Sequence, residues 1–174
     1  IATTGFHKSE FYDKSHFLWK YDTEQLVELL VADVCDGIDI YDYAGPIVKR
    51  SEGRAGVIKA ACSLQSITTV EKKELRAAAI ASNITGAPVS LHLEKGTMAL
   101  EAIDILLENG AKPNNIILGH IDRNPDYYYH EQIAKRGVFL IYDGAARVKY
   151  YTDEVIARLI EHMVEAGFED QLLM

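Results

Sequence analysis

The chain has 174 residues, of which 48% are hydrophobic and 25% charged, and its formal net charge is −8 at pH 7. This length can bury a sizeable core, but it is short for a complete (β/α)8 barrel, which needs about 250 residues. The acidic balance argues against nucleic-acid and anionic-membrane partners, because both attract clustered Lys and Arg. The only cysteines, Cys35 and Cys62, exclude a disulfide framework and a Cys-based zinc site. The composition predicts one cytoplasmic α/β domain over residues 1–174.

Short apolar runs alternate with longer amphipathic stretches along the whole chain. Continuous apolar runs are typical of strands that are buried on both faces, as in parallel sheets. The predicted strands are Ile1–Phe6, Gly56–Ala61, Val89–Leu93, Ile116–Gly119 and Val138–Tyr142, and Gln171–Met174 begins another. The predicted helices are Thr23–Val34, Val70–Asn83, Thr97–Asn109, Asp126–Arg136 and Asp153–Ala166.

This alternation implies parallel strands joined by right-handed crossovers. An open doubly wound sheet and a closed barrel both satisfy the pattern. A doubly wound sheet usually has a glycine-rich phosphate loop after an early strand, and the sequence contains no G-x-G-x-x-G or G-x-x-x-x-G-K motif. The missing motif favours the barrel without excluding the open sheet.

Three successive strands place a candidate metal ligand near their carboxyl ends, where chemistry collects in both architectures. Lys59 lies inside an apolar strand, and His92 and His120 follow on the next two. Burial favours the neutral amine of a lysine, which can react with carbon dioxide to give a carbamate that bridges two cations. Neutral histidines are suitable zinc ligands. Taken singly, such a lysine is usually solvated and such a histidine is usually structural, but together they predict a shared metal site.

The other histidines are expected to have ordinary roles. His7 ends the first predicted strand and could join the site, although we expect a loop residue. The remaining three are predicted to lie on the surface, in a loop or on helices: His16, His130 and His162.

Several segments resemble the phosphotriesterase-like family of the amidohydrolase superfamily. They are Arg-Ala-Gly-Val-Ile-Lys-Ala-Ala at 54–61, the strand-end His92, and Leu-Gly-His-Ile-Asp-Arg-Asn-Pro-Asp at 118–126. The spacings of 33 residues from Lys59 to His92 and 28 from His92 to His120 are similar as well. The segment Tyr142–Tyr151 resembles the branch whose members are lactonases acting on phosphorylated sugar lactones.

The resemblance implies a (β/α)8 barrel of which this chain covers strands three to seven, their helices and the start of strand eight. It also implies two divalent metal ions, expected to be Zn²⁺, bridged by carboxylated Lys59 and bound by His92 and His120. Lys149 and Tyr150 match the branch's substrate-binding pair. In this family a hydroxide shared by the metals would open the lactone ring.

The departures from the family pattern are equally specific. No His-x-His pair is present, and the family's catalytic Asp on strand eight is expected just beyond Met174, so no catalytic residue is assigned within the chain. Arg123 and Gly144 occupy positions where true phosphotriesterases have an Asp and a His. These differences weaken the organophosphate-hydrolase interpretation and leave the lactonase interpretation intact.

Two alternatives stay open at this point. The first is another ester or amide hydrolase of the same superfamily, and the second is an inactive barrel fragment that acts as a binding or structural module. The expected partner is a small molecule, and a homo-oligomer is possible. The aromatic segments Phe11–Tyr21 and 127–129 are expected to pack helices onto the barrel, with a lid or a subunit contact as the alternative.

Overall fold

A computed structural model describes all 174 residues and contains one sheet of six parallel strands. Each strand pairs with the one that follows it in the chain, in the order β1-β2-β3-β4-β5-β6. The strands are β1 (Ala2–Gly5), β2 (Ala55–Cys62), β3 (Val89–Leu93), β4 (Ile116–Gly119), β5 (Phe139–Ile141) and β6 (Leu172–Leu173). Every predicted strand is therefore confirmed, including the one expected to begin near the end of the chain.

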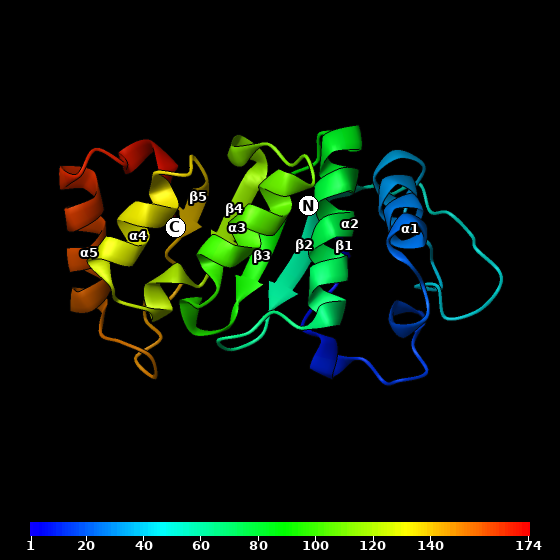
Figure 1. Ribbon diagram of the computed structural model, residues 1–174, viewed down its shortest axis with the longest axis horizontal. Coiled ribbons are helices and arrows are strands. Elements are labelled where there is room, and N and C mark those ends of the chain that lie inside the picture. Colours follow the sequence, from blue (N-terminus) through cyan, green and yellow to red (C-terminus); the bar gives the residue numbers. More distant parts are fainter.

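One α-helix connects each pair of successive strands, and Figure 1 shows these helices as a layer in front of the sheet. Right-handed crossovers that always step in the same direction put all helices on one face. This is the arrangement of a (β/α)8 barrel, and the predicted architecture is confirmed for these six strands. None of the helices has the length and apolar character that crossing a bilayer requires. The helices are α1 (Thr23–Cys35), α2 (Thr69–Thr85), α3 (Ala99–Glu108), α4 (Tyr127–Ala134) and α5 (Asp153–Glu165).

The two faces of the sheet differ because side chains alternate along a strand. On β2, Ile58 and Ala60 are fully buried against the helices, whereas Lys59 is only partly buried on the opposite face. On β3, Leu91 is likewise buried and His92 is partly buried. The hydrophobic core of 33 residues therefore lies between the sheet and the helices, and the open face of the sheet carries the polar candidates.

Two buried glutamates one turn apart on α2 have opposite environments. Glu71 accepts hydrogen bonds from the Ser63 hydroxyl at 2.6 Å and from the Thr68 and Ser9 backbone amides at 2.9 and 3.3 Å. These bonds complete a capping box at the start of the helix and tie it to the segments after β1 and β2. Burial alone would raise the pKa of Glu71, but the hydrogen bonds outweigh it and lower the pKa.

Glu74 is equally buried, at 1% exposure, and neither of its carboxylate oxygens has a hydrogen-bond partner. Burial raises the pKa of Glu74 to about 9, with a smaller contribution from the nearby charge of Glu71. A buried carboxyl without donors is more stable as the neutral acid. Glu74 therefore lowers the stability of the fold, in contrast to Glu71.

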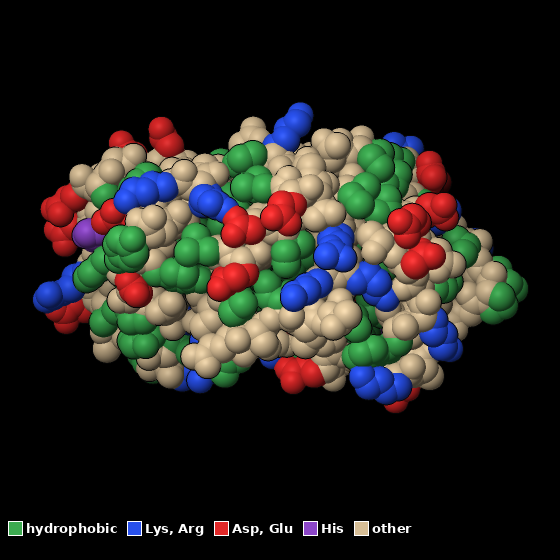
Figure 2. Space-filling model, in the orientation of Figure 1, with side chains coloured by type: hydrophobic (Ala, Val, Ile, Leu, Met, Phe, Trp, Pro, Cys, Tyr) green, Lys and Arg blue, Asp and Glu red, His purple; other side chains and the backbone are tan.

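The segment 37–53 between α1 and β2 is tied to α1 by hydrogen bonds and exposes apolar side chains. Asp33, at 3% exposure, accepts hydrogen bonds from Arg50 Nη1 at 2.7 Å and the Tyr43 hydroxyl at 2.6 Å. Figure 2 shows apolar atoms at this end of the molecule, while charges of both signs are interspersed over the helix-covered face. The exposed apolar side chains of the segment are Ile40, Tyr41, Ile47 and Val48.

The tyrosines at the start of α4 differ in how they pack. The Tyr129 hydroxyl accepts a hydrogen bond from the backbone amide of Ala99 at 2.8 Å and so links α4 to the start of α3. The Tyr127 ring lies 4.6 Å from the His162 ring of α5. Tyr128 is 70% exposed. Two of the three tyrosines thus contact neighbouring helices, as expected.

We expect Glu74→Met to raise the free energy of unfolding by about 1–3 kcal/mol near pH 8, because it removes a buried carboxyl without partners. The pKa of Glu74 is higher in the folded state than its usual value of 4.5, so the folded state binds the extra proton. The contribution of Glu74 to wild-type stability must therefore fall as pH rises between these two values, and the gain from the substitution should be smaller near pH 5. Urea unfolding at both pH values measures the difference.

Glu71→Met is the matched control for this experiment. It removes a carboxylate with satisfied hydrogen bonds and should destabilise the protein by a similar amount. An unchanged or reduced stability of Glu74→Met near pH 8 would contradict the assignment of Glu74 as an unpaired buried acid.

Candidate metal and substrate site

Lys59 lies on the open face of β2 with no hydrogen bond or ion pair to its ammonium group. In the strand register it stands between Gly5 of β1 and Ser90 of β3. Gly5 has a φ of +107°, and a Cβ there would lie 2.1 Å from the Lys59 carbonyl oxygen, so only glycine fits. Burial lowers the pKa of Lys59, and the negative charge of Asp143 opposes this shift. The surroundings thus shift the amine toward its neutral, reactive form.

The rings of His92 and His120 lie side by side, with their centroids 4.6 Å apart. His92 is on β3, and His120 follows β4 in a left-handed backbone conformation with φ of 68°. Nε2 of His92 donates to Glu94 at 3.2 Å, and Nδ1 of His120 donates to Asp143 at 2.9 Å. The structure therefore brings together the two histidines that the sequence pattern placed at neighbouring strand ends.

Each of these two imidazoles keeps one ring nitrogen without a protein partner, Nδ1 in His92 and Nε2 in His120. A metal-binding histidine typically donates its other nitrogen to a carboxylate, as both do here. Burial is the main cause that lowers the pKa of His92 to about 4, so this ring is neutral near pH 7, as metal binding requires.

These residues fit a metal ion only when Lys59 is included. No three His, Cys, Asp or Glu side chains in the structure are arranged to hold a metal ion. The two histidines supply two nitrogen ligands, and Lys59 would supply oxygen ligands only after carboxylation. The donor set is therefore suited to divalent cations that accept both nitrogen and oxygen ligands, such as zinc.

His7 lies next to this cluster. Its ring centroid is 4.6 Å from that of His92, and its Nδ1 accepts a hydrogen bond from the Lys8 backbone amide at 2.8 Å. The Lys8 ammonium forms ion pairs with Glu94 at 2.7 Å and Glu10 at 2.6 Å. The segment after β1 is thus part of the hydrogen-bond network around His92. The sequence pattern predicts only a loop at His7 and gives no sign of these contacts.

His130 was expected on the surface, and this prediction is wrong, because the residue is completely buried. Nε2 of His130 donates to the carbonyls of Asn124 at 2.7 Å and Ile121 at 3.1 Å, and Nδ1 accepts from the Tyr142 hydroxyl at 2.8 Å. These bonds hold the turn that follows His120 against the end of β5. The amphipathic pattern of α4 could not reveal these distant polar partners. His16 and His162 are partly buried.

Lys149 and Tyr150 lie in the loop between β5 and α5. The ammonium of the exposed Lys149 is 4.8 Å from the centre of the Tyr150 ring. The guanidinium of Arg123, three residues after His120, is 4.4 Å from the centre of the same ring. Arg123 therefore connects the predicted substrate pair to the turn that carries a predicted metal ligand.

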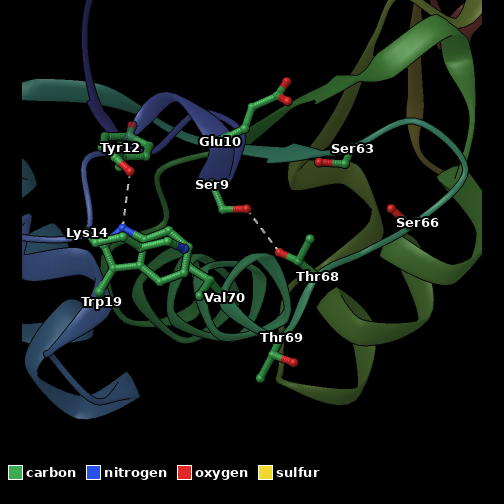
Figure 3. Close-up of a pocket in the computed structure, with 10 residues that line it drawn as sticks. All are labelled: Ser9, Glu10, Tyr12, Lys14, Trp19, Ser63, Ser66, Thr68, Thr69 and Val70. Atoms are coloured by element: carbon green, nitrogen blue, oxygen red, sulfur yellow. Dashed lines mark hydrogen bonds between the residues drawn. The ribbon is translucent and has the colours of Figure 1, made fainter.

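A separate cavity of about 560 Å³ lies at the N-terminus of α2, and no predicted site residue lines it. Figure 3 shows the Ser9 and Thr68 hydroxyls facing each other across 3.2 Å, and the Trp19 indole donating to the Tyr12 carbonyl at 3.3 Å. The aromatic segment Phe11–Tyr21 thus forms part of a cavity wall in addition to packing. The lining residues are Ser9, Glu10, Tyr12, Lys14, Trp19, Ser63, Ser66, Thr68, Thr69 and Val70.

Sequence reasoning missed Glu94 and Asp143, the two carboxylates that orient the histidines. A signal for both existed, because each follows closely on the end of a predicted strand. Carboxylates at strand ends are common, however, and only the fold reveals which histidine each one contacts.

Comparison with known proteins places this geometry in a family. The model of the phosphotriesterase family matches residues 1–174. A phospho-furanose lactonase from Mycoplasmopsis synoviae is 44% identical over 176 residues, which cover 100% of this chain and 50% of that protein.

Solved structures give the same result. The crystal structure of an amidohydrolase from Mycoplasma synoviae matches with a TM-score of 0.95 and 44% identity, over 99% of this chain and 49% of that chain. A lactonase from Listeria monocytogenes matches with a TM-score of 0.88 and 35% identity, over 99% of this chain and 54% of that chain. The chain thus spans about half the length of the relatives it matches. Since the family model matches from the first residue to the last, the chain belongs to the phosphotriesterase family.

Proposed function

We propose that this chain supplies metal- and substrate-binding residues to a hydrolase that opens phosphorylated lactones. The observation that carries the proposal is the pair of histidines, each with one nitrogen bonded to a carboxylate and the other free, near the unpaired Lys59. The similarity to a phospho-furanose lactonase and to a lactonase of known structure supports the substrate class. A cytoplasmic location and a homo-oligomeric state are expectations from the sequence that we retain.

The metal-binding residues in this proposal are Lys59, His92 and His120. The neutral amine of Lys59 attacks carbon dioxide and releases one proton, which leaves a carbamate with the charge and oxygen ligands of a carboxylate. The free nitrogens of the two histidines then complete the part of the ligand set that this chain provides. Two divalent metal ions held by these residues, in our proposal Zn²⁺, would supply Lewis-acid polarisation of a carbonyl oxygen and would lower the pKa of bound water.

Asp143 and Glu94 orient these ligands. Asp143 contacts His120 Nδ1 through both carboxylate oxygens, at 2.9 and 2.6 Å. Glu94 contacts His92 and is itself held by Lys8, whose hydrogen bond is the main cause that lowers the pKa of Glu94 to about 2. Glu94 is thereby kept ionised, and each of the two carboxylates fixes the tautomer and rotation of one imidazole.

Lys149 and Tyr150 bind the phosphate of the substrate in this proposal. An ammonium group and a phenol hydroxyl are both donors to phosphate oxygens. The loop that follows the seventh strand of such barrels is frequently a phosphate-binding site. Binding the phosphate here would orient the lactone ring without contact to the reacting carbonyl.

We expect Lys59→Ala to lower the metal content of the intact protein and to reduce kcat/KM for a phosphorylated lactone by at least about 100-fold, because the bridging ligand is lost. Elemental mass spectrometry after purification without chelator measures the metal, and a short carboxylate such as propionate should restore part of the activity. Lys112→Ala, at an exposed loop position, is the control. Full metal content and activity in Lys59→Ala without added carboxylate would refute the assignment.

Lys149→Ala should raise KM for a phosphorylated lactone by about 10- to 100-fold and leave KM for the unphosphorylated lactone nearly unchanged, since a hydrogen bond to a charged group is lost only in the first case. Steady-state kinetics on the two substrates give the comparison. Equal effects on both would show that Lys149 does not contact the phosphate.

A further inference from the structure

His130 is completely buried on α4, and both nitrogens of its ring are hydrogen-bonded. Nε2 lies 2.7 Å from the carbonyl oxygen of Asn124 and 3.1 Å from that of Ile121, and Nδ1 lies 2.8 Å from the Tyr142 hydroxyl. A carbonyl only accepts hydrogen bonds, so the proton of the neutral ring must be on Nε2. Nδ1 is then the acceptor, and the Tyr142 hydroxyl donates to it. These bonds therefore fix one tautomer of His130.

Burial keeps both partners of the His130–Tyr142 bond in the form that the bond requires. It lowers the pKa of His130, and the bonds to the two carbonyls only partly oppose this shift, so the ring stays neutral. It raises the pKa of Tyr142, which is 1% exposed, so the phenol keeps its proton. Separating a buried donor from its acceptor costs free energy. The bond is therefore a firm link between α4 and the end of β5.

The partners of His130 flank the hydrogen bond between His120 and Asp143. Ile121 follows His120 in the chain, and Tyr142 precedes Asp143. His120 has a left-handed backbone conformation with φ of 68°, which persists only where the surrounding structure imposes it. His130 binds the carbonyl of the very next residue, so it acts on the backbone that holds this conformation. Its ring thus connects the backbone that carries His120 with the backbone that carries Asp143.

Two further contacts hold these backbone segments in place. Asp122, in the turn after β4, lies so close to Gly144 that a Cβ on this glycine would be 2.1 Å from the Asp122 Oδ2. The backbone amide of Tyr142 donates to the Leu173 carbonyl at 2.9 Å and so fixes the end of β5 against β6. The Tyr142 hydroxyl is therefore presented to α4 from a fixed position.

We propose that His130 is a positioning residue for the candidate metal ligand His120. Through Ile121 and Tyr142 it sets the separation of His120 from Asp143, and it thereby directs the free Nε2 of His120 toward a metal ion. A neutral imidazole suits this role because it presents one donor and one acceptor on a rigid ring. The inference rests on the proposed function for the metal ion, whereas the position of the His120 ring is a property of the chain itself.

The test uses the intact protein and begins with Tyr142→Phe, which removes only the hydroxyl that donates to His130. Tyr129→Phe is the matched control, because the Tyr129 hydroxyl also forms a 2.8 Å hydrogen bond, but with the Ala99 amide at the start of α3. Competition with a chromogenic chelator measures the dissociation constant of zinc. We expect it to rise by about 10- to 100-fold in Tyr142→Phe and to stay as in wild type in Tyr129→Phe.

Substitutions of His130 itself separate its hydrogen bonds from its packing. His130→Leu fills much of the same space without a polar atom, whereas His130→Gln keeps one donor and one acceptor. We expect His130→Leu to weaken zinc binding at least as much as Tyr142→Phe does, and His130→Gln to lie between His130→Leu and wild type. The kcat for phosphorylated and unphosphorylated lactones should fall by the same factor, because His130 contacts neither substrate. If His130→Leu does not fold, Tyr142→Phe decides the question.

Nuclear magnetic resonance of the metal-free protein, with isotope-labelled histidine, separates this inference from the proposed function because it needs neither metal nor turnover. The chemical shift of the His120 Nδ1–H reports on its hydrogen bond to Asp143. A change of this shift in Tyr142→Phe but not in Tyr129→Phe supports the positioning role, and absence of zinc binding in the wild type would then reject only the proposed function. The positioning role is overturned by an unchanged shift, by equal effects of the two variants, or by an unchanged dissociation constant in a protein that binds zinc.

Discussion

The parallel register of the strands is the constraint on which the candidate site depends. It aligns Gly5, Lys59 and Ser90 in one row across three strands and places His92 opposite Gly119 in another. Residues about one βα unit apart in sequence thereby become neighbours at the carboxyl edge of the sheet. The alternation of side chains along each strand then separates the apolar residues under the helices from the polar residues on the open face. A shift of one residue would exchange the two sets.

Buried ionisable groups without a partner have two different consequences in this protein. Lys59 is partly buried on the open face of the sheet, where the proposed carboxylation and metal ions would supply its missing partners. Glu74 lies on α2, on the helix-covered side of the sheet, and its carboxyl has no hydrogen-bond partner, so burial keeps it protonated. Glu71, one turn away, shows what the same side chain does when donors are available. Location in the fold, and not burial alone, therefore distinguishes a functional group from a destabilising one.

The histidines are oriented by contacts that cross the fold. Asp143 comes from the end of β5 and holds His120 after β4. Glu94 follows β3 and is held in turn by Lys8, which follows β1. The buried His130 of α4 holds the turn that follows His120. The segments after β1, β3, β4 and β5 each supply either a candidate ligand or a residue that orients one. The geometry of the site therefore depends on how these strands pack in the sheet.

The sequence by itself determined the order of strands and helices, because continuous apolar runs and helix caps are local signals. It also determined the candidates Lys59, His92 and His120, because strand ends of parallel sheets meet at one edge. Only the tertiary structure decided that Asp143 contacts His120, that His7 lies against His92, that His130 is buried and that Arg123 packs on Tyr150. These contacts join segments that share no local pattern, and side-chain partners across a fold are set by packing, which periodicity does not encode.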